Sequence, residues 1–197
     1  MNPFWNRASA DGDATASGDG TAASGTGFDD WETFDPDHVP EPGPFLEGHD
    51  VLEGEDHVAF HRVTRDLFEE RGVYDATFGY NLAKLNLDRR HPDAGFRYAV
   101  DADDPSVLRA EFTPTTEFCP QADALVRGSF RAWNGLSEEH DYDEVRVRVH
   151  PSHYQADPLN DSLDRLEAEF HETGRVPGEP GSTSRNCGDE PTGESPF

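Results

Sequence analysis

One cysteine in this chain lies where its thiol could do chemistry. Cys119 follows the run Thr113-Pro114-Thr115-Thr116 and precedes Pro120, a residue that suits the first position of a helix because it lacks an N–H. Cys119 is therefore expected at or next to a helix start, where free backbone N–H groups and the helix dipole favour a thiolate. The sequence predicts a reactive thiol or a transient metal contact. The alternative is a small buried residue that packs a strand–helix junction.

The threonines before the cysteine have two possible roles. The hydroxyls of Thr113, Thr115 and Thr116 either orient a ligand or bond the backbone of their own loop, the usual role of threonine in turns. Together with Pro114, Cys119 and Pro120, they form the expected functional loop.

His153 and Asn160 are the expected supporting residues. If the strand before His153 ends beside Cys119, the two residues form a thiolate–imidazole pair, suited to a metal or to an activated nucleophile. Otherwise His153 bonds its own loop. Asn160 is expected near the cap of the last helix.

The remaining histidine and cysteine signals are weaker. His57 and His61 are four residues apart on the first helix, without the glutamate of a zinc protease motif, and are expected on a solvated face. Cys187 lies in the C-terminal tail. One thiolate cannot hold an iron–sulfur cluster, which takes about four ligands, so a cluster would bridge two chains, as in a homodimer, or borrow ligands from a partner or from Cys187.

The elements that position these residues follow from the spacing of apolar side chains. Helical spacing predicts three helices, over residues 56–72, 120–135 and 158–171. Alternation predicts three strands, over residues 96–101, 108–113 and 145–150. The first two strands form a hairpin, and a long connection favours parallel pairing of the third. The predicted fold is α+β, with the order αββαβα and helices packed on one face of a small three-stranded mixed sheet.

Composition divides the chain into three parts. Residues 1–50 are polar and acidic and are expected to form a disordered arm, residues 51–172 the α+β domain, and residues 173–197 a disordered tail. The formal net charge is −25, with 41 acidic against 16 basic residues. Such a surface repels nucleic acids and anionic membranes and is typical of proteins that work at multimolar salt. No apolar run reaches the ~20 residues of a membrane span, and we expect a cytoplasmic protein.

Several of these residues together resemble a known family. Phe112-Thr113-Pro114-Thr115 ends a strand, Cys119 precedes a helix, and Pro151 and His153 follow a valine-rich strand, with Asn160 soon after. This pattern resembles the PaaD/SufT-like family of iron–sulfur assembly factors, closest to the branch that contains the targeting subunit of the eukaryotic cytosolic machinery. The resemblance covers about residues 96–171.

The resemblance implies a protein that is not an enzyme. Family members help to mature iron–sulfur proteins, and a reactive loop cysteine, which maps onto Cys119, is their best-known feature. The implied partners are iron–sulfur carriers or scaffolds and recipient apoproteins, and the implied cargo is a transient iron–sulfur cluster or iron. Two alternatives remain open: a PaaD-like accessory protein for one oxygenase, and a structural adaptor without cysteine chemistry.

Overall fold

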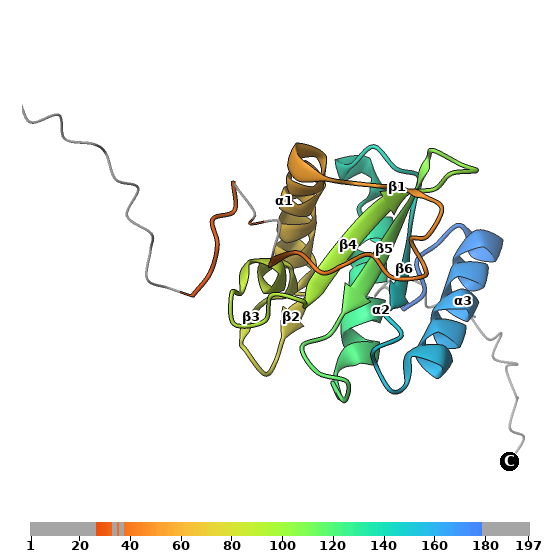
Figure 1. Ribbon diagram of the computed structural model, residues 1–197. Coiled ribbons are helices and arrows are strands. Elements are labelled where there is room, and N and C mark those ends of the chain that lie inside the picture. Colours follow the sequence, from red (N-terminus) through yellow and green to blue (C-terminus); the bar gives the residue numbers. More distant parts are fainter. Residues whose placement is uncertain (1–26, 33–34, 36–37, 179–197) are drawn as a thin grey trace, which may run out of the picture.

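The computed structural model describes residues 27–32, 35 and 38–178 and confirms the α+β class. Its main elements follow the predicted order αββαβα (Figure 1). They are α1 (Gly54–Arg71), β4 (Gly95–Val100), β5 (Val107–Thr113), α2 (Ala122–Gly135), β6 (Glu144–Val149) and α3 (Ala156–Thr173). The smaller elements are β1 (Asp50–Val51), the hairpin of β2 (Tyr74–Asp75) and β3 (Tyr80–Asn81), and the 3-10 helices η2 (Leu82–Leu87) and η3 (Ser137–Glu139).

The main sheet has the strand order β1-β4-β5-β6. β4 and β5 form the expected antiparallel hairpin, in which Phe96 lies opposite Phe112. β6 pairs with β5 in parallel after the α2 crossover, as predicted, with Phe112 opposite Val149. The expectation of three strands is wrong, because β1 adds a fourth at the edge of β4.

One face of the sheet is apolar and carries α1 and α2, while α3 lies beside β6 (Figure 1). Alternate residues of the strands point to this face, as the period of a strand requires. Trp133 of α2 is fully buried there; its ring centroid lies 5.3 Å from that of Phe96, and its indole N–H donates to Thr64 Oγ1 at 3.1 Å. Burial of these large side chains is the main source of stability.

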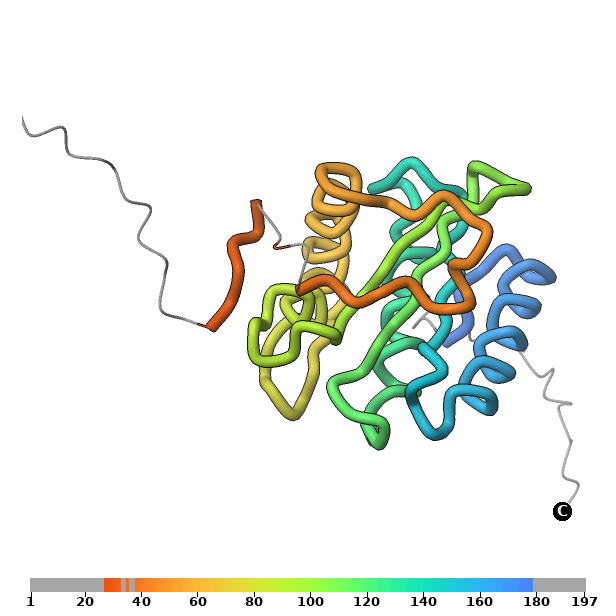
Figure 2. Tube along the Cα trace, viewed as in Figure 1, coloured from red at the N-terminus to blue at the C-terminus, as the bar shows by residue number. Residues whose placement is uncertain are grey.

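The other face of the sheet carries charged residues and is crossed by an N-terminal segment, residues 38–49, which we call the strap (Figure 2). Two backbone N–H groups of the strap, those of Gly43 and Phe45, donate to the buried Glu111 carboxylate at 2.6 and 3.2 Å. The Phe45 ring packs against two guanidinium groups, 4.8 Å from that of Arg109 and 5.1 Å from that of Arg148. The strap therefore covers a polar surface with specific contacts.

The strap corrects the predicted domain boundary. Leu46 is almost fully buried, and the backbone of residues 50–51 pairs with β4, so the folded unit starts before residue 51. Composition alone suggested a disordered arm because glycine, proline and acidic residues dominate it. The folded unit also extends past residue 172, because α3 ends at Thr173 and Val176 is buried. Residues 1–26, 33–34, 36–37 and 179–197, which belong to the two expected tails, lie outside the described residues.

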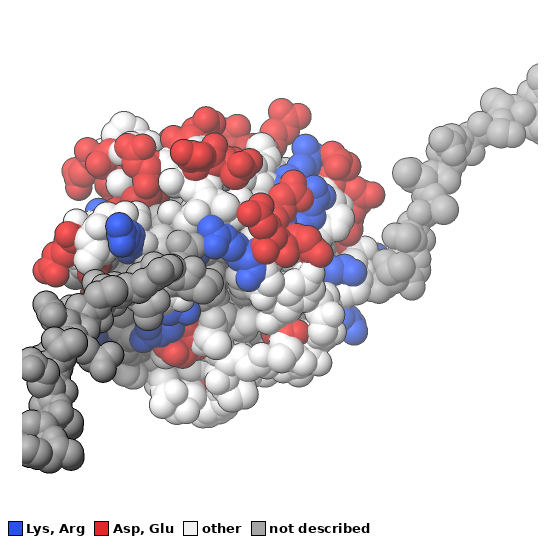
Figure 3. Space-filling model, turned by 180° about the vertical axis from the view of Figure 1, so that it is seen from behind, with Lys and Arg blue, Asp and Glu red and all other residues white. Residues whose placement is uncertain are grey.

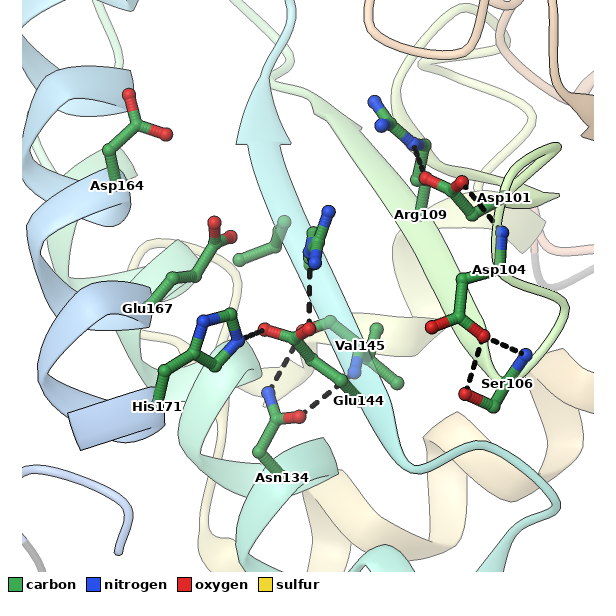
Figure 4. Close-up of polar contacts among 12 residues, drawn as sticks. Asp101, Asp104, Ser106, Arg109, Asn134, Glu144, Val145, Asp164, Glu167 and His171 are labelled. Carbon is green, nitrogen blue, oxygen red and sulfur yellow. Dashed lines mark hydrogen bonds and ion pairs between the residues drawn. The ribbon is translucent and has the colours of Figure 1, made fainter. Parts of the chain in front are cut away.

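Two asparagine side chains hydrogen-bond to β6, an edge strand of the main sheet. Asn134 of α2 accepts from Val145 N at 2.8 Å and donates to Val145 O at 2.9 Å (Figure 4). Asn160 makes the same pair of bonds with Val149, at 2.8 and 3.0 Å. Asn160 was expected at a helix cap, but α3 begins four residues earlier, at Ala156, and the amide instead occupies backbone groups that an edge strand leaves open.

The predicted end of the first helix is confirmed and its start is not. Gly72 closes α1 in the left-handed conformation, with φ 68°, which glycine adopts without strain. α1 begins at Gly54, before the predicted start at residue 56, and its N-cap is Glu53. His57 and His61, expected on a solvated face, are buried with their rings stacked at 5.7 Å. The buried face of α1 is wider than the stripe through Phe60 indicated, because Tyr98 of β4 and Ala83 of η2 also pack against the two histidines.

Charge is unevenly spread over the surface. Seen from the helix side, carboxylates gather along the upper part, whereas the lower end is mostly uncharged (Figure 3). Within the described residues, no helix has the length and apolar character needed to cross a membrane.

Candidate functional site

Two segments that are far apart in sequence meet at the lower end of the sheet (Figure 1). The cysteine loop, residues 114–121, follows β5, and the histidine turn, residues 150–155, follows β6. Because β5 and β6 are parallel, their carboxyl ends lie at the same edge of the sheet. The backbone N–H of Tyr154 donates to Glu117 O at 3.0 Å and ties the turn to the loop. The structure thus brings the predicted loop and His153 together.

His153 supports the loop through the backbone of Cys119. Its Nε2–H donates to the Cys119 carbonyl at 3.2 Å, and its Nδ1 accepts from Gln155 N at 3.2 Å. Both ring nitrogens are therefore engaged, and the two bonds require the neutral tautomer with the proton on Nε2. No bond from the imidazole to the Cys119 thiol is formed, so the structure favours the loop-bonding role over the thiolate–imidazole pair.

Cys119 is half-buried, and its thiol is not activated. Burial raises the pKa of this thiol, and the nearby Asp75 carboxylate raises it further, while N–H groups of Gln121 and Ala122 act in the opposite direction. The backbone donors predicted around the sulfur are thus present, but desolvation outweighs them. The expected preference for a thiolate is wrong for this state of the protein.

The helix after the cysteine starts later than Pro120. α2 begins at Ala122, its N-cap is Gln121, and Pro120 lies in the preceding turn. The Gln121 side chain accepts from Ala76 N at 3.1 Å and donates to Thr77 Oγ1 at 2.6 Å. These bonds join the cysteine loop to the β2–β3 hairpin. Sequence reasoning missed this role, because a lone glutamine gives no signal of a contact 44 residues away.

The threonines line a cleft. In the part of the chain that the structure describes, no hydrogen bond ties their hydroxyls to the loop backbone, in contrast to the usual role of threonine in turns. The cleft has a volume of about 550 Å³. Among the residues that line it are Thr113, Pro114, Thr115, Thr116, His150 and Ser152. The threonine hydroxyls can therefore meet a partner or ligand, whereas His150 Nδ1 is engaged with the hydroxyl and backbone N–H of Ser152.

Two exposed aromatic rings flank the half-buried cysteine. Phe118 is 65% exposed and Tyr154 is 60% exposed, and their ring centroids lie 5.0 Å apart. Large apolar side chains exposed together are a feature of interaction sites. Neither residue belongs to a sequence motif, but each lies in a loop directly beside a predicted site residue, and this position is the signal that could have identified it.

Potential metal ligands are not clustered among the described residues. Over residues 27–32, 35 and 38–178, no group of three or more His, Cys, Asp or Glu side chains is arranged for an ion. Cys119 contributes one protonated thiol, and His153 is engaged at both nitrogens. This donor set does not fit a resident cluster, which takes about four ligands. Cys187, the second cysteine, lies outside the described residues.

Comparison with known proteins identifies a family. The family model described as "Domain of unknown function (DUF7998)" matches residues 26–177, a range that includes the strap and all the elements described above. No curated protein and no solved structure matches the chain. The chain belongs to the DUF7998 family.

Proposed function

We propose that this protein is a non-enzymatic, cytoplasmic factor in the maturation of iron–sulfur proteins, and that it contacts its partners through the lower end of the sheet. The observation that carries the proposal is the junction of the cysteine loop and the histidine turn around Cys119, with Phe118 and Tyr154 exposed beside it. Seen from the helix side, this end of a strongly acidic molecule shows few charged residues (Figure 3), whereas the cleft beside it is also lined by Glu41, Arg90, Asp93 and Glu117. An uncharged surface with exposed aromatic rings suits protein binding.

The iron–sulfur cluster enters this proposal as cargo. A single protonated thiol does not retain a cluster, but after it loses its proton to solvent it can contribute one thiolate ligand when carrier and recipient proteins supply the others. Contact with a partner would also change the surroundings of Cys119, since its pKa depends on burial and on Asp75. The partners would be a carrier or scaffold and recipient apoproteins.

The raised pKa of Cys119 favours a second candidate, an adaptor that binds the same partners without cysteine chemistry. The rate of thiol alkylation separates the two. An adaptor cysteine reacts more slowly than a free thiol both alone and with the partner bound, whereas a working cysteine becomes faster in the complex.

Genetic complementation tests the proposal. A deletion strain should lose activity of iron–sulfur enzymes while enzymes without clusters stay normal, and the wild-type gene should restore it. The double variant Phe118→Ser and Tyr154→Ser should fail to restore it, because it removes the exposed ring pair without touching the core. The matched control is Tyr74→Ser, an aromatic residue that is 41% exposed outside this site.

Each outcome of this test bears on one statement. Unchanged iron–sulfur enzyme activity in the deletion strain would overturn the proposed function. Full restoration by the double variant would overturn the assigned surface. Restoration by Cys119→Ala would select the adaptor, and its failure would select direct contact with the cargo.

A further inference from the structure

A groove of about 370 Å³ lies between α2, the end of α1 and the β2–β3 hairpin. Gly178, the last of the described residues, lines one end of it beside Arg131, whose Nε–H donates to Pro177 O at 2.8 Å. Tyr74 and Gln121 line the other end. The two ends are about 15 Å apart, because a helix rises about 1.5 Å per residue between Gln121 and Arg131.

The second end of the groove lies beside the Cys119 thiol. Backbone N–H groups of Gln121 and Ala122 bond the sulfur, and the Asp75 carboxylate is close enough to act on it. Gln121 itself and Tyr74, the neighbour of Asp75 in β2, line the groove. The half-buried thiol therefore lies where the start of α2 meets the β2–β3 hairpin, and this junction closes the groove.

The charge of the groove is opposite to that of the molecule as a whole. Of the described residues that line it, Arg71 and Arg131 are charged and none is acidic, whereas the chain carries a formal net charge of −25. Residues 179–197 contain four acidic residues and one basic residue, and the first of them, Glu179, directly follows Gly178. Because opposite charges attract, the groove suits the segment of the chain that begins at its end.

The length of that segment matches the length of the groove. Cys187 comes nine residues after Gly178. A flexible linker of this length has a root-mean-square end-to-end distance of about 15–18 Å, and it spans at most about 30 Å when extended. Two linked groups reach their highest effective concentration when this distance equals the span between their sites. Cys187 therefore meets the length requirement for a partner of Cys119.

We propose that residues 179–187 dock in this groove and that Cys187 forms a reversible disulfide with Cys119. The oxidant is a small-molecule disulfide. One cysteine thiolate attacks a sulfur of this disulfide and releases one small thiolate, and the second cysteine thiolate then attacks the mixed disulfide and releases the other. The two cysteines lose two electrons, the small disulfide gains them, and the two protons of the cysteines pass to the two small thiols that are released.

This disulfide regulates the site at the lower end of the sheet. It takes the Cys119 sulfur away from the cargo, and reduction by a small thiol returns it. Disulfides in the cytosol are usually transient and sense the redox state, as this one would. The regulatory consequence rests on the proposed function, whereas the formation of the disulfide does not.

Thiol–disulfide exchange with the full chain tests the proposal. The protein is equilibrated at fixed molar salt with 2-mercaptoethanol and its disulfide, which are uncharged, and free thiols are then trapped with N-ethylmaleimide. Mass spectrometry should find a monomer without trapped thiols, in which Cys119 and Cys187 are joined. Mixed disulfides alone, or chains joined to one another, would overturn the proposal. Because no iron–sulfur protein is present, this result is independent of the complementation test of the proposed function.

A surface variant tests whether the groove holds the segment. Ala124 is exposed and lines the groove, so Ala124→Glu places a carboxylate among the arginines. The effective concentration of the two thiols should fall about threefold, the factor expected for one exposed ion pair. Ala168→Glu adds the same charge at an exposed position of α3 and is the matched control, with the wild-type value expected. A wild-type value in Ala124→Glu would overturn docking in the groove.

Discussion

The two faces of the main sheet are covered in different ways. The helix face is closed by large apolar side chains, with Trp133, Phe96 and Tyr98 fully buried. The strap face is closed by a non-helical segment, whose contacts are a buried carboxylate and a ring beside two guanidinium groups. Apolar packing is non-directional and gives a large total stabilisation. The strap depends on a few directional contacts, each of which contributes about 1 kcal/mol. A single substitution should therefore remove a smaller fraction of the stabilisation on the helix face than on the strap face.

The largest effect is expected on the helix face. Trp133→Ala should lower the free energy of unfolding by about 3–5 kcal/mol, because it leaves a cavity where the indole ring packed. Phe118→Ala, at an exposed aromatic residue, is the control and should change it by no more than about 0.5 kcal/mol. Urea denaturation at fixed salt measures both. Equal losses of unfolding free energy in the two variants would show that the helix face is not the main source of stability.

The buried histidines behind the helix face should make stability depend on pH. Burial, the largest cause, lowers the pKa of His57 to about 2 and that of His61 to about 4. Both rings stay neutral in the folded chain, whereas the unfolded chain takes up protons below about pH 6.5. Stability is thus fully present above pH 6.5. It is lost as pH falls toward 4, at up to about 1.4 kcal/mol per pH unit for each histidine.

The variant His57→Phe sharpens this prediction. It removes one titrating group and keeps a ring at the same place, so the slope of unfolding free energy against pH between 6.5 and 5 should fall by about half the histidine contribution. Glu111, whose pKa burial raises, changes stability in the opposite direction at low pH and is the same in both proteins. An unchanged slope in His57→Phe would contradict a neutral buried ring.

The strap should respond to a single methyl group. A Cβ on Gly43 would overlap the Glu111 carboxylate and the His150 ring, so Gly43→Ala should cost about 1–3 kcal/mol and speed proteolysis within residues 38–49. Gly128→Ala is the matched control. Its Cβ would meet only Val73 methyl groups, at 3.6 and 3.7 Å, and alanine favours the helix by up to about 1 kcal/mol. Wild-type stability and protease resistance in Gly43→Ala would mean that the strap is not held as described.

Much of the fold could be predicted because it follows from the spacing of apolar residues along the chain. Alternating residues in β4, β5 and β6 and the helical stripes of α2 and α3 lead to the order αββαβα, and the long crossover leads to the parallel pair. The strap could not be predicted. Its glycines and prolines resemble those of a disordered arm, and its partner Glu111 lies 68 residues away from Gly43.

The candidate site was only partly predictable. The parallel pairing of β5 and β6 explains why the cysteine loop and His153 meet. The sequence predicted this meeting only on the condition that the strand before His153 ends beside Cys119. The protonation state of the Cys119 thiol could not be predicted. The backbone donors near Cys119 are a local property of the sequence, whereas its burial and the charge of Asp75 come from distant segments. The exposed pair of Phe118 and Tyr154 also needs two loops to be brought together.

By itself, the amino-acid sequence determined the helices, the strands and the residues that would gather at one end of the sheet, because hydrophobic periodicity acts over short distances along the chain. Only the tertiary structure decided which of them are exposed and which are covered. Desolvation keeps the Cys119 thiol protonated, the strap closes the charged face, and Arg97 is left with a buried donor. Burial and charge interactions depend on groups that are close in space and far apart in sequence.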